Sequence, residues 1–189
     1  RVAIYLEKRI ETVVSIFGVT CAGGVFVPIN PLLKAEQVSY IQHDCNVKIL
    51  ITSGDRLNLL ATVLPQCPEL QTVIVVGTQE ELPSIPGLNI LKWNDLLDFA
   101  ASFNRPHRID SDMAAILYTS GSTGKPKGVV LSHRNLLAGA KSVASYLDNT
   151  ANDRILAVLP LSFDYGLSQL TTAFSVGASV VLINHFQKQ

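Results

Sequence analysis

The sequence predicts an α/β protein in which helices cover the faces of a parallel β-sheet. Short, uninterrupted apolar strands such as VAIYL and VKILIT alternate with segments of helical periodicity. Strands that helices cover on both faces are apolar at successive positions, as these are. A strand, helix, glycine turn and strand recur at both ends, with RVAIY leading to AGGVFVPIN and RILAV leading to VGASVVLIN. This repeat predicts two stacked α/β subdomains of similar build.

Local patterns predict the order of the elements. The first half is expected to hold the strand VAIYL, a helix over 9–21, the strand VFVPI, a helix over 34–45, the strand VKILIT, a helix over 55–63 and the strand TVIVVG. The second half is expected to hold the strands AAILYTSG and VVLSH, a helix over 135–147, the strand RILAVLPL, a further helix and the strand SVVLI. Two looser stretches, QEELPSIPG and FNRPHRID, flank an expected short helix over 95–101. They divide the chain into a subdomain over 1–104 and the start of a second over 105–189.

The composition predicts apolar surface that meets further chain. Hydrophobic residues make up 48% of the sequence and charged residues only 16%, against about 25% charged in typical soluble domains. The sequence begins at Arg1 and stops shortly after an apolar run, so we expect both ends to be cut. The missing remainder of the chain is therefore the first expected partner of this surface.

Charge and cysteine patterns exclude several classes of function. Fifteen basic residues balance 15 acidic ones, so no overall field recruits nucleic acid or an anionic membrane. The long uncharged stretches 12–33 and 165–186 are interrupted by glycine, and the first also by proline, so neither predicts a membrane span. The three cysteines are far apart in the sequence, which predicts no metal site and no disulfide framework. We interpret them as small buried apolar residues in a reducing, cytoplasmic protein.

The segment YTSGSTGKPKG, residues 118–128, predicts a phosphate-binding loop. Three glycines, four hydroxyl residues and two lysines fall within it. Glycines let backbone N–H groups turn inward around an anion, hydroxyls donate to phosphate oxygens, and lysines balance their charge. The spacing matches neither a Walker A loop nor a dinucleotide-binding GxGxxG. A flexible linker is the alternative, but the apolar strands on both sides favour a loop held on a sheet.

The longer segment YTSGSTGKPKGVVLSHRN resembles the signature of the adenylate-forming, or AMP-binding, enzymes. This superfamily includes acyl-CoA synthetases, aryl-CoA ligases, firefly-type luciferases and the amino-acid adenylation domains of peptide synthetases. GGVFVPINPLLKAEQVSYIQHDCNVKILIT and DRILAVLPLSFDYGLSQL resemble the family's upstream segment and its acid-substrate region. The resemblance covers essentially all 189 residues. It implies an acyl-CoA synthetase-like N-terminal domain fragment, with two stacked sheets flanked by helices.

The resemblance implies a two-step reaction that uses ATP, Mg²⁺ and CoA. A small-molecule carboxylic acid attacks the α-phosphate of ATP, pyrophosphate leaves, and a thiol then takes the acyl group from the adenylate. The family's pyrophosphate loop corresponds to Thr119, Ser120, Gly121, Ser122, Thr123, Gly124, Lys125 and Lys127. Lys125 and Thr123 are the candidates for a catalytic role, since lysine charge stabilises the leaving pyrophosphate. No metal ligand is assigned in this sequence.

Three further residues are candidates for contact with the acid. His133 follows the motif and opens the next helix, where fixing the strand-to-helix corner is the alternative role. Asp164 is the only charged residue between Arg154 and Lys188, and an unpaired carboxylate among apolar residues would be costly, so it is expected to have a cationic or hydrogen-bonding partner. The Phe163–Asp164 pair resembles a segment of amino-acid adenylation domains. In those domains the aspartate of this segment holds the α-ammonium group of the substrate.

The acid class stays open at this point. Many acyl-CoA and aryl-CoA ligases carry an aromatic or His-containing segment where this chain has FDYG, although some bacterial acyl-CoA ligase-like proteins linked to exosortase systems are similar to FDYGLSQL. We favour an acyl-CoA ligase; the alternatives are an amino-acid adenylation domain and a non-catalytic nucleotide-binding module. For Asp164 itself, the alternative to contact with the substrate is a structural role as a helix cap or an ion-paired residue. The family's acidic magnesium ligand, ribose-binding aspartate, hinge and late catalytic lysine are expected beyond Gln189. Residues 1–189 alone are therefore expected to be inactive.

Overall fold

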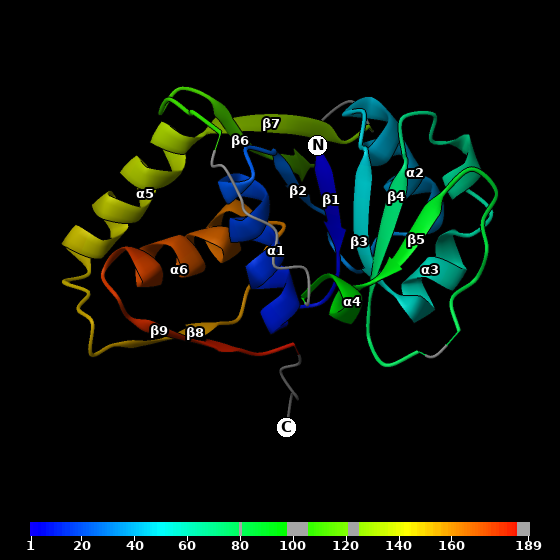
Figure 1. Ribbon diagram of the computed structural model, residues 1–189. Helices are drawn as coiled ribbons and strands as arrows, with labels where there is room; N and C mark the ends of the chain where they lie inside the picture. Colours follow the sequence, from blue (N-terminus) through cyan, green and yellow to red (C-terminus); the bar gives the residue numbers. More distant parts are fainter. Residues whose placement is uncertain (80, 98–105, 121–124, 185–189) are drawn as a thin grey trace.

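Two β-sheets and their covering helices form the fold in the computed structural model, which describes residues 1–79, 81–97, 106–120 and 125–184 (Figure 1). The main sheet has seven strands in the order β5-β4-β3-β1-β2-β6-β7, and β8 and β9 form a second sheet. The strands are β1 Val2–Tyr5, β2 Phe26–Pro28, β3 Ile49–Ser53, β4 Thr72–Val76, β5 Asn89–Lys92, β6 Met113–Thr119, β7 Lys127–Ser132, β8 Arg154–Ala157 and β9 Ser179–Leu182. The helices are α1 Ile10–Cys21, α2 Ala35–Asp44, α3 Gly54–Leu60, α4 Trp93–Leu97, α5 His133–Tyr146 and α6 Asp164–Ser175, with a 3-10 turn at Leu64–Gln66.

Strands β1 to β5 form the parallel part of the main sheet. β1 pairs in parallel with β2 and β3, β3 with β4, and β4 with β5. Ala3 and Leu50 belong to a core on one face with α2 and α3, whereas Ile4 and Ile51 belong to a core on the other face with α1 and α6. Because successive strand residues point to opposite faces, helices on both faces explain why these strands are apolar throughout.

Strands β6 and β7 extend the main sheet as an antiparallel hairpin. β6 pairs in parallel with β2 through Ala115 and Phe26, and β7 then pairs antiparallel with β6. At the end of this ladder next to the connecting loop, Tyr118 faces Gly128 and Thr119 faces Lys127. The two sides of the expected phosphate loop are therefore held side by side on a sheet, as the flanking apolar strands predicted.

Helix α6 lies between the two sheets. Its Leu167 and Leu170 are buried in the same cluster as Ile4 of β1, and Val180 and Leu182 of β9 pack against that cluster. The two sheets are thus stacked with a helix between them, which confirms the architecture predicted from the sequence (Figure 1).

A polar connection joins the end of β1 to the ends of β8 and β9. The Asn184 side chain accepts from the Lys8 backbone N–H at 2.9 Å and donates to the Lys8 carbonyl at 3.0 Å. Lys8 Nζ donates to the carbonyls of Ala157, at 2.9 Å, and Val158, at 2.7 Å. Burial lowers the pKa of Lys8. These bonds fix the position of the second sheet relative to the main sheet at the carboxyl ends of β1, β8 and β9.

Most expected elements are confirmed, and three expectations need correction. The sequence prediction left out β5, because NILK is only four residues long and mixes polar with apolar positions. The strand expected over RILAVLPL ends at Ala157. The helix expected over 95–101 begins earlier, at Trp93, and residues 98–101 lie outside the described part of the chain. The division into subdomains 1–104 and 105–189 stays a prediction.

The three cysteines do not behave alike. Cys45 and Cys67 are buried, as expected, and burial raises the pKa of both thiols. The expectation is wrong for Cys21, which is exposed. Cys21 is the last residue of α1, and the buried residues of that helix lie on its opposite face, at positions 12, 15, 16 and 19.

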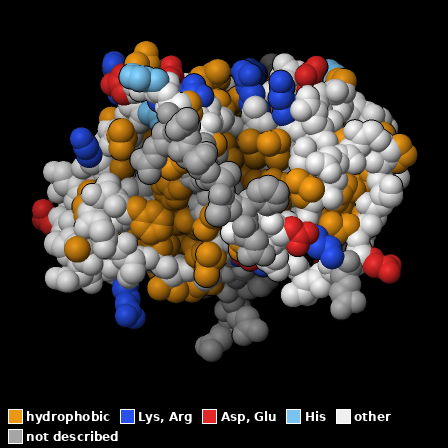
Figure 2. Space-filling view, viewed as in Figure 1, with side chains coloured by type: hydrophobic (Ala, Val, Ile, Leu, Met, Phe, Trp, Pro, Cys, Tyr) orange, Lys and Arg blue, Asp and Glu red, His pale blue; other side chains and the backbone are white. Residues whose placement is uncertain are grey.

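Apolar side chains are exposed where α1, α5 and α6 meet, as Figure 2 shows. Phe17 of α1 and Phe174 of α6 place their ring centroids 5.5 Å apart, and both rings remain partly exposed together with Leu137 of α5. This surface agrees with the low charge content of the sequence. Within the described ranges, no helix has both the length and the apolar character needed to cross a membrane.

Candidate functional site

The loop end of the β6–β7 hairpin carries all the predicted phosphate-binding residues that the structure describes. Thr119 ends β6, Ser120 follows it, and Lys125 lies two residues before Lys127, the first residue of β7. The remaining predicted positions, Gly121, Ser122, Thr123 and Gly124, lie outside the described residues. The hairpin therefore brings residues from both sides of the motif to one edge of the sheet.

Two lysine side chains lie at this end of the hairpin. Lys125 and Lys127 are exposed, and neither side chain forms an ion pair or hydrogen bond with another described residue. Thr119 and Ser120 are also exposed beside them. Two unneutralised positive charges next to two hydroxyl groups form a surface that attracts phosphate oxygens.

Gly128 allows close packing next to this edge. A Cβ atom on Gly128 would lie 2.8 Å from Ile116 Cγ2 and 3.2 Å from Tyr118 Cζ. Tyr118 is the cross-strand partner of Gly128, so its ring occupies the space that a side chain there would need. The last glycine of the motif thus has a packing role.

A pocket of about 380 Å³ joins the hairpin to the start of α6. The hairpin contributes Leu117, Tyr118, Thr119, Val129 and Leu131, and the chain entering α6 contributes Ser162, Phe163, Asp164 and Tyr165. Most of these side chains are apolar or aromatic; the polar exceptions are Thr119 on the hairpin side and Ser162 and Asp164 on the α6 side. An apolar pocket with a few polar groups is typical of a small-molecule site.

The structure thus brings Phe163 and Asp164 to the pocket that Thr119 also lines. Phe163 is the N-cap residue of α6 and is half-exposed, and Asp164 is its first helical residue. Their position is fixed at Gly166, where a Cβ atom would lie 2.0 Å from the Pro160 carbonyl oxygen. The first turn of α6 therefore packs directly on the backbone that leads into it.

The Asp164 side chain is exposed, although its sequence neighbours are apolar. It forms no hydrogen bond or ion pair with any residue that the structure describes. The expected partner is therefore not found within the described ranges, and exposure removes the burial cost from which it was inferred. The carboxylate is left open toward the pocket.

His133 lies elsewhere. It is the first residue of α5, and its backbone N–H donates to the Asp112 carbonyl at 3.1 Å. Its side chain lines a separate hollow with Phe17, Leu136 and Phe174, which does not include Thr119 or Asp164. The structure therefore favours the alternative role of His133 at the strand-to-helix corner, and contact with substrate stays a prediction.

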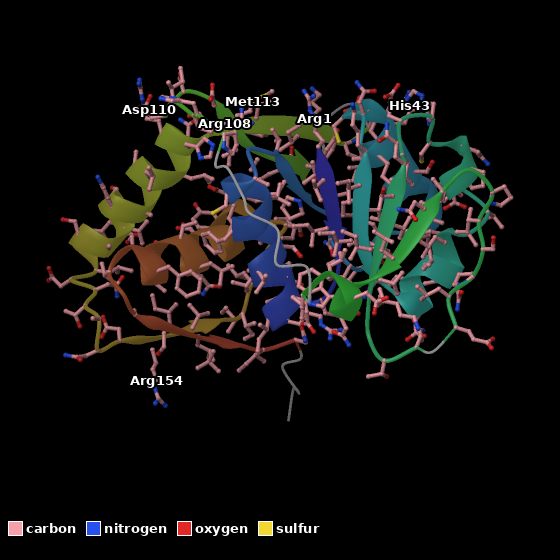
Figure 3. All side chains as sticks on the ribbon, in the orientation of Figure 1. Arg1, His43, Arg108, Asp110, Met113 and Arg154 are labelled. Atoms are coloured by element: carbon pink, nitrogen blue, oxygen red, sulfur yellow. The ribbon has the colours of Figure 1, made fainter. Side chains whose placement is uncertain are left out.

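Other bonds fix the same corner. Ser132 Oγ accepts from the Asn135 N–H at 3.1 Å, and Asn135 Oδ1 accepts from the Ser132 N–H at 2.9 Å, which closes a capping box at the start of α5. Arg134 donates two hydrogen bonds, at 2.9 and 2.8 Å, to Asp110, which Figure 3 labels near the start of α5. These contacts set the direction in which β7 leads into α5.

Two features of the site have no signal in the sequence pattern. Ser162 lines the pocket, and its buried hydroxyl has no hydrogen-bond partner among the described residues. Tyr118 donates a hydrogen bond to Asp44 of α2. Both depend on contacts between segments far apart in the chain, which periodicity and motif spacing do not encode.

The comparisons with known proteins agree with this geometry. Residues 1–189 match the family profile described as AMP-binding enzyme. The chain is 31% identical over 185 residues to tyrocidine synthase 3 of Brevibacillus parabrevis, and 32% identical over 170 residues to the peroxisomal long chain acyl-CoA synthetase 7 of Arabidopsis thaliana. These matches cover 96% and 87% of this chain.

A solved structure supports the same relationship. The fold is similar to that of the anthranilate CoA ligase AuaEII in complex with anthranoyl-AMP, with a TM-score of 0.86 and 28% sequence identity. That match covers 97% of this chain and 35% of the ligase. The chain spans only 2% of tyrocidine synthase 3 and 24% of the Arabidopsis synthetase. The profile match, the relatives and the fold together show that the chain belongs to the AMP-binding enzyme family.

Proposed function

We propose that this chain is part of an ATP-dependent ligase that activates a carboxylic acid as an acyl-adenylate and then transfers the acyl group to the thiol of CoA. One observation carries the proposal. The same pocket is lined by Thr119, at the loop end of the hairpin, and by Phe163 and Asp164, at the start of α6. A nucleotide held at the hairpin would place its α-phosphate close to an acid held in this pocket.

In the first step, a carboxylate oxygen of the acid attacks the α-phosphorus of ATP. A new oxygen–phosphorus bond forms while the bond from the α-phosphorus to the bridging oxygen breaks, and pyrophosphate leaves with that oxygen. Lys125 and Lys127 provide positive charge for the leaving group, and Thr119 and Ser120 provide hydroxyl donors. Thr123 keeps its proposed catalytic role from the motif. In the second step the thiol attacks the acyl carbon, AMP leaves, and a thioester forms.

Mg²⁺ is expected to accompany ATP. The described parts of the chain gather no group of three His, Cys, Asp or Glu side chains that could hold a metal ion. We assign no step to the ion. The chain's own contribution is the lysine charge, the hydroxyl donors and the shape of the pocket.

Amino-acid activation is the second candidate function. Asp164 is exposed, lies at the pocket and has no partner among the described residues, so it could bind the ammonium group of an amino acid. The similarity to tyrocidine synthase 3 supports this candidate, just as the similarity to the Arabidopsis synthetase supports the acyl-CoA ligase. The thiol of a carrier protein would then replace CoA. A cytoplasmic location stays a prediction from the cysteine pattern.

Acid-dependent exchange of labelled pyrophosphate into ATP tests the proposal. The full-length protein is assayed with fatty, aryl and amino acids, and the preferred acid is then incubated with ATP and CoA. Exchange with a fatty or aryl acid and formation of its CoA thioester supports the acyl-CoA ligase. Exchange confined to amino acids, with no CoA thioester, supports the second candidate. Nucleotide binding without exchange for any acid would indicate the non-catalytic module.

A further inference from the structure

Helix α2 contacts the phosphate hairpin on both sides of its loop. The Tyr40 hydroxyl donates to the Pro126 carbonyl at 3.3 Å, and the Tyr118 hydroxyl donates to Asp44 Oδ2 at 2.6 Å. Tyr118 lies one residue before the end of β6, and Pro126 directly precedes β7. Because Tyr40 and Asp44 are one turn apart, they lie on the same face of α2. The two bonds therefore connect one helix face to both sides of the loop.

Packing fixes the positions of the Tyr118 ring and of helix α2, which these bonds connect. The Tyr118 ring is half-buried and lies against Gly128, which has no side chain to displace it. Burial and the hydrogen bond to Asp44 raise the pKa of Tyr118, so its hydroxyl keeps the proton that it donates. On the helix side, Val38 and Ile41 of α2 are fully buried in the core. The helix is thus a rigid support for the hairpin.

We propose that Tyr40 and Asp44 are positioning residues for ATP, which act through Pro126 and Tyr118 and do not touch the nucleotide themselves. Their bonds add to the β6–β7 ladder, which already pairs Thr119 with Lys127, and fix the spacing of the loop ends beyond it, where Ser120 and Lys125 lie. This inference rests on the proposed function. Phosphate binding that depends on groups from both strands requires this spacing to be set before ATP arrives.

The expected signature is a change in the interaction with ATP that leaves the acid unaffected. Tyr40→Phe and Tyr118→Phe each remove one hydroxyl and keep the ring. Each should raise the KM for ATP about two- to tenfold, the factor that corresponds to the net loss of one hydrogen bond. For Tyr40→Phe the KM for the acid should stay within experimental error, because Tyr40 does not line the pocket at α6. Tyr118 does line that pocket, so Tyr118→Phe tests the effect on ATP alone. Tyr146→Phe, on an exposed residue of α5, is the matched control and should change neither value.

The Asp44–Tyr118 bond permits a stricter test. Asp44→Ala removes the acceptor, whereas Asp44→Asn keeps an oxygen that can accept from Tyr118 and should restore much of the ATP affinity. The double variant Asp44→Ala with Tyr118→Phe should be no worse than the poorer single variant, since both changes break the same bond. A purely structural role would instead lower thermal stability in all variants without this pattern in ATP affinity.

The experiment combines pyrophosphate exchange on the full-length protein, at varied ATP and varied acid, with calorimetric titration of ATP into each variant. Increased KM and Kd for ATP in the two Phe variants, with rescue by Asp44→Asn, supports the proposal. Equal ATP binding by the wild type and by the folded Tyr40→Phe and Tyr118→Phe variants overturns it. If the wild type binds ATP but exchanges with no acid, the ligase assignment fails while the titrations still test the positioning role. Failure of the wild type to bind ATP overturns both.

Discussion

Thr119, the last residue of β6, and Asp164, the first residue of α6, line the same pocket although β7, α5 and β8 separate them in the chain. Thr119 belongs to the phosphate motif, and Asp164 to the segment that resembles an acid-binding region. Stacking of the two sheets around α6 brings them together. The fold therefore places the proposed phosphate-binding hairpin beside the proposed acid pocket.

Loss of either hairpin lysine should weaken ATP binding. Lys125→Ala and Lys127→Ala each remove an exposed charge that has no acidic partner among the described residues, so each should raise the KM for ATP about tenfold or more at low salt. The effect should shrink as ionic strength rises, because salt screens exposed charges. Lys141→Ala, on the exposed side of α5, is the matched control. An increase in the KM for ATP that is the same for all three variants would contradict a specific role for the hairpin.

Replacement of Asp164 should distinguish the two acid classes. If its carboxylate binds a substrate ammonium, Asp164→Asn removes a charge-assisted bond of about 1.5–3 kcal/mol, roughly a ten- to hundredfold loss in exchange rate. The loss should affect only acids that carry an α-amino group. We expect to measure it with matched pairs of acids that differ by that group alone. Equal loss for both members of each pair would rule out the ammonium contact and favour an acyl substrate.

Gly166 and Gly139 should respond in opposite ways to alanine. A Cβ atom on Gly166 would lie 2.0 Å from the Pro160 carbonyl oxygen, whereas one on Gly139 of α5 meets no atom within 4 Å. Gly166→Ala should lower the free energy of unfolding by about 1–3 kcal/mol or more through overpacking. Gly139→Ala should raise it by about 0.5–1 kcal/mol, since glycine is unfavourable inside a helix. Urea unfolding checks both, and a stable Gly166→Ala variant would contradict the close packing at the start of α6.

A low pH should weaken the contact between Glu7 and Arg56. Burial would raise the pKa of Glu7, but hydrogen bonds and charge from Arg56, with a contribution from the backbone, outweigh burial and lower it. The stabilisation is full above the ordinary glutamate pKa of about 4.3 and is lost as pH falls through the lower folded pKa. The wild type should therefore lose stability as the pH falls from about 5 to about 3. Glu7→Gln has no carboxylate to protonate at this position, so it should lose less over the same range.

Urea unfolding at several pH values measures this difference. Glu69→Gln, at an exposed residue that forms no ion pair with the described residues, serves as the control and should retain the acid sensitivity of the wild type. An unchanged pH dependence in Glu7→Gln would show that the ion pair adds nothing to stability.

The sequence could predict the features that short sequence patterns encode, and it could not predict contacts between distant segments. The hairpin followed from glycines between two apolar strands, and the parallel sheet from strands that are apolar at every position. Strand β5 was missed because four residues carry too little pattern, and Cys21 was misplaced because its residue type does not reveal which face of α1 it occupies. The contacts of α2 with the hairpin could not be predicted, since they depend on where the chain returns in space.

Transfer of oxygen from the acid to AMP tests the central claim most directly. The full-length protein is incubated with ATP, CoA and an acid whose carboxylate carries isotopically heavy oxygen, and the products are analysed by mass spectrometry. Attack of the carboxylate on the α-phosphorus predicts pyrophosphate, an acyl thioester and AMP that carries one heavy oxygen from the acid. Formation of ADP, or of AMP without the heavy oxygen, would contradict an acyl-adenylate and with it the proposed function.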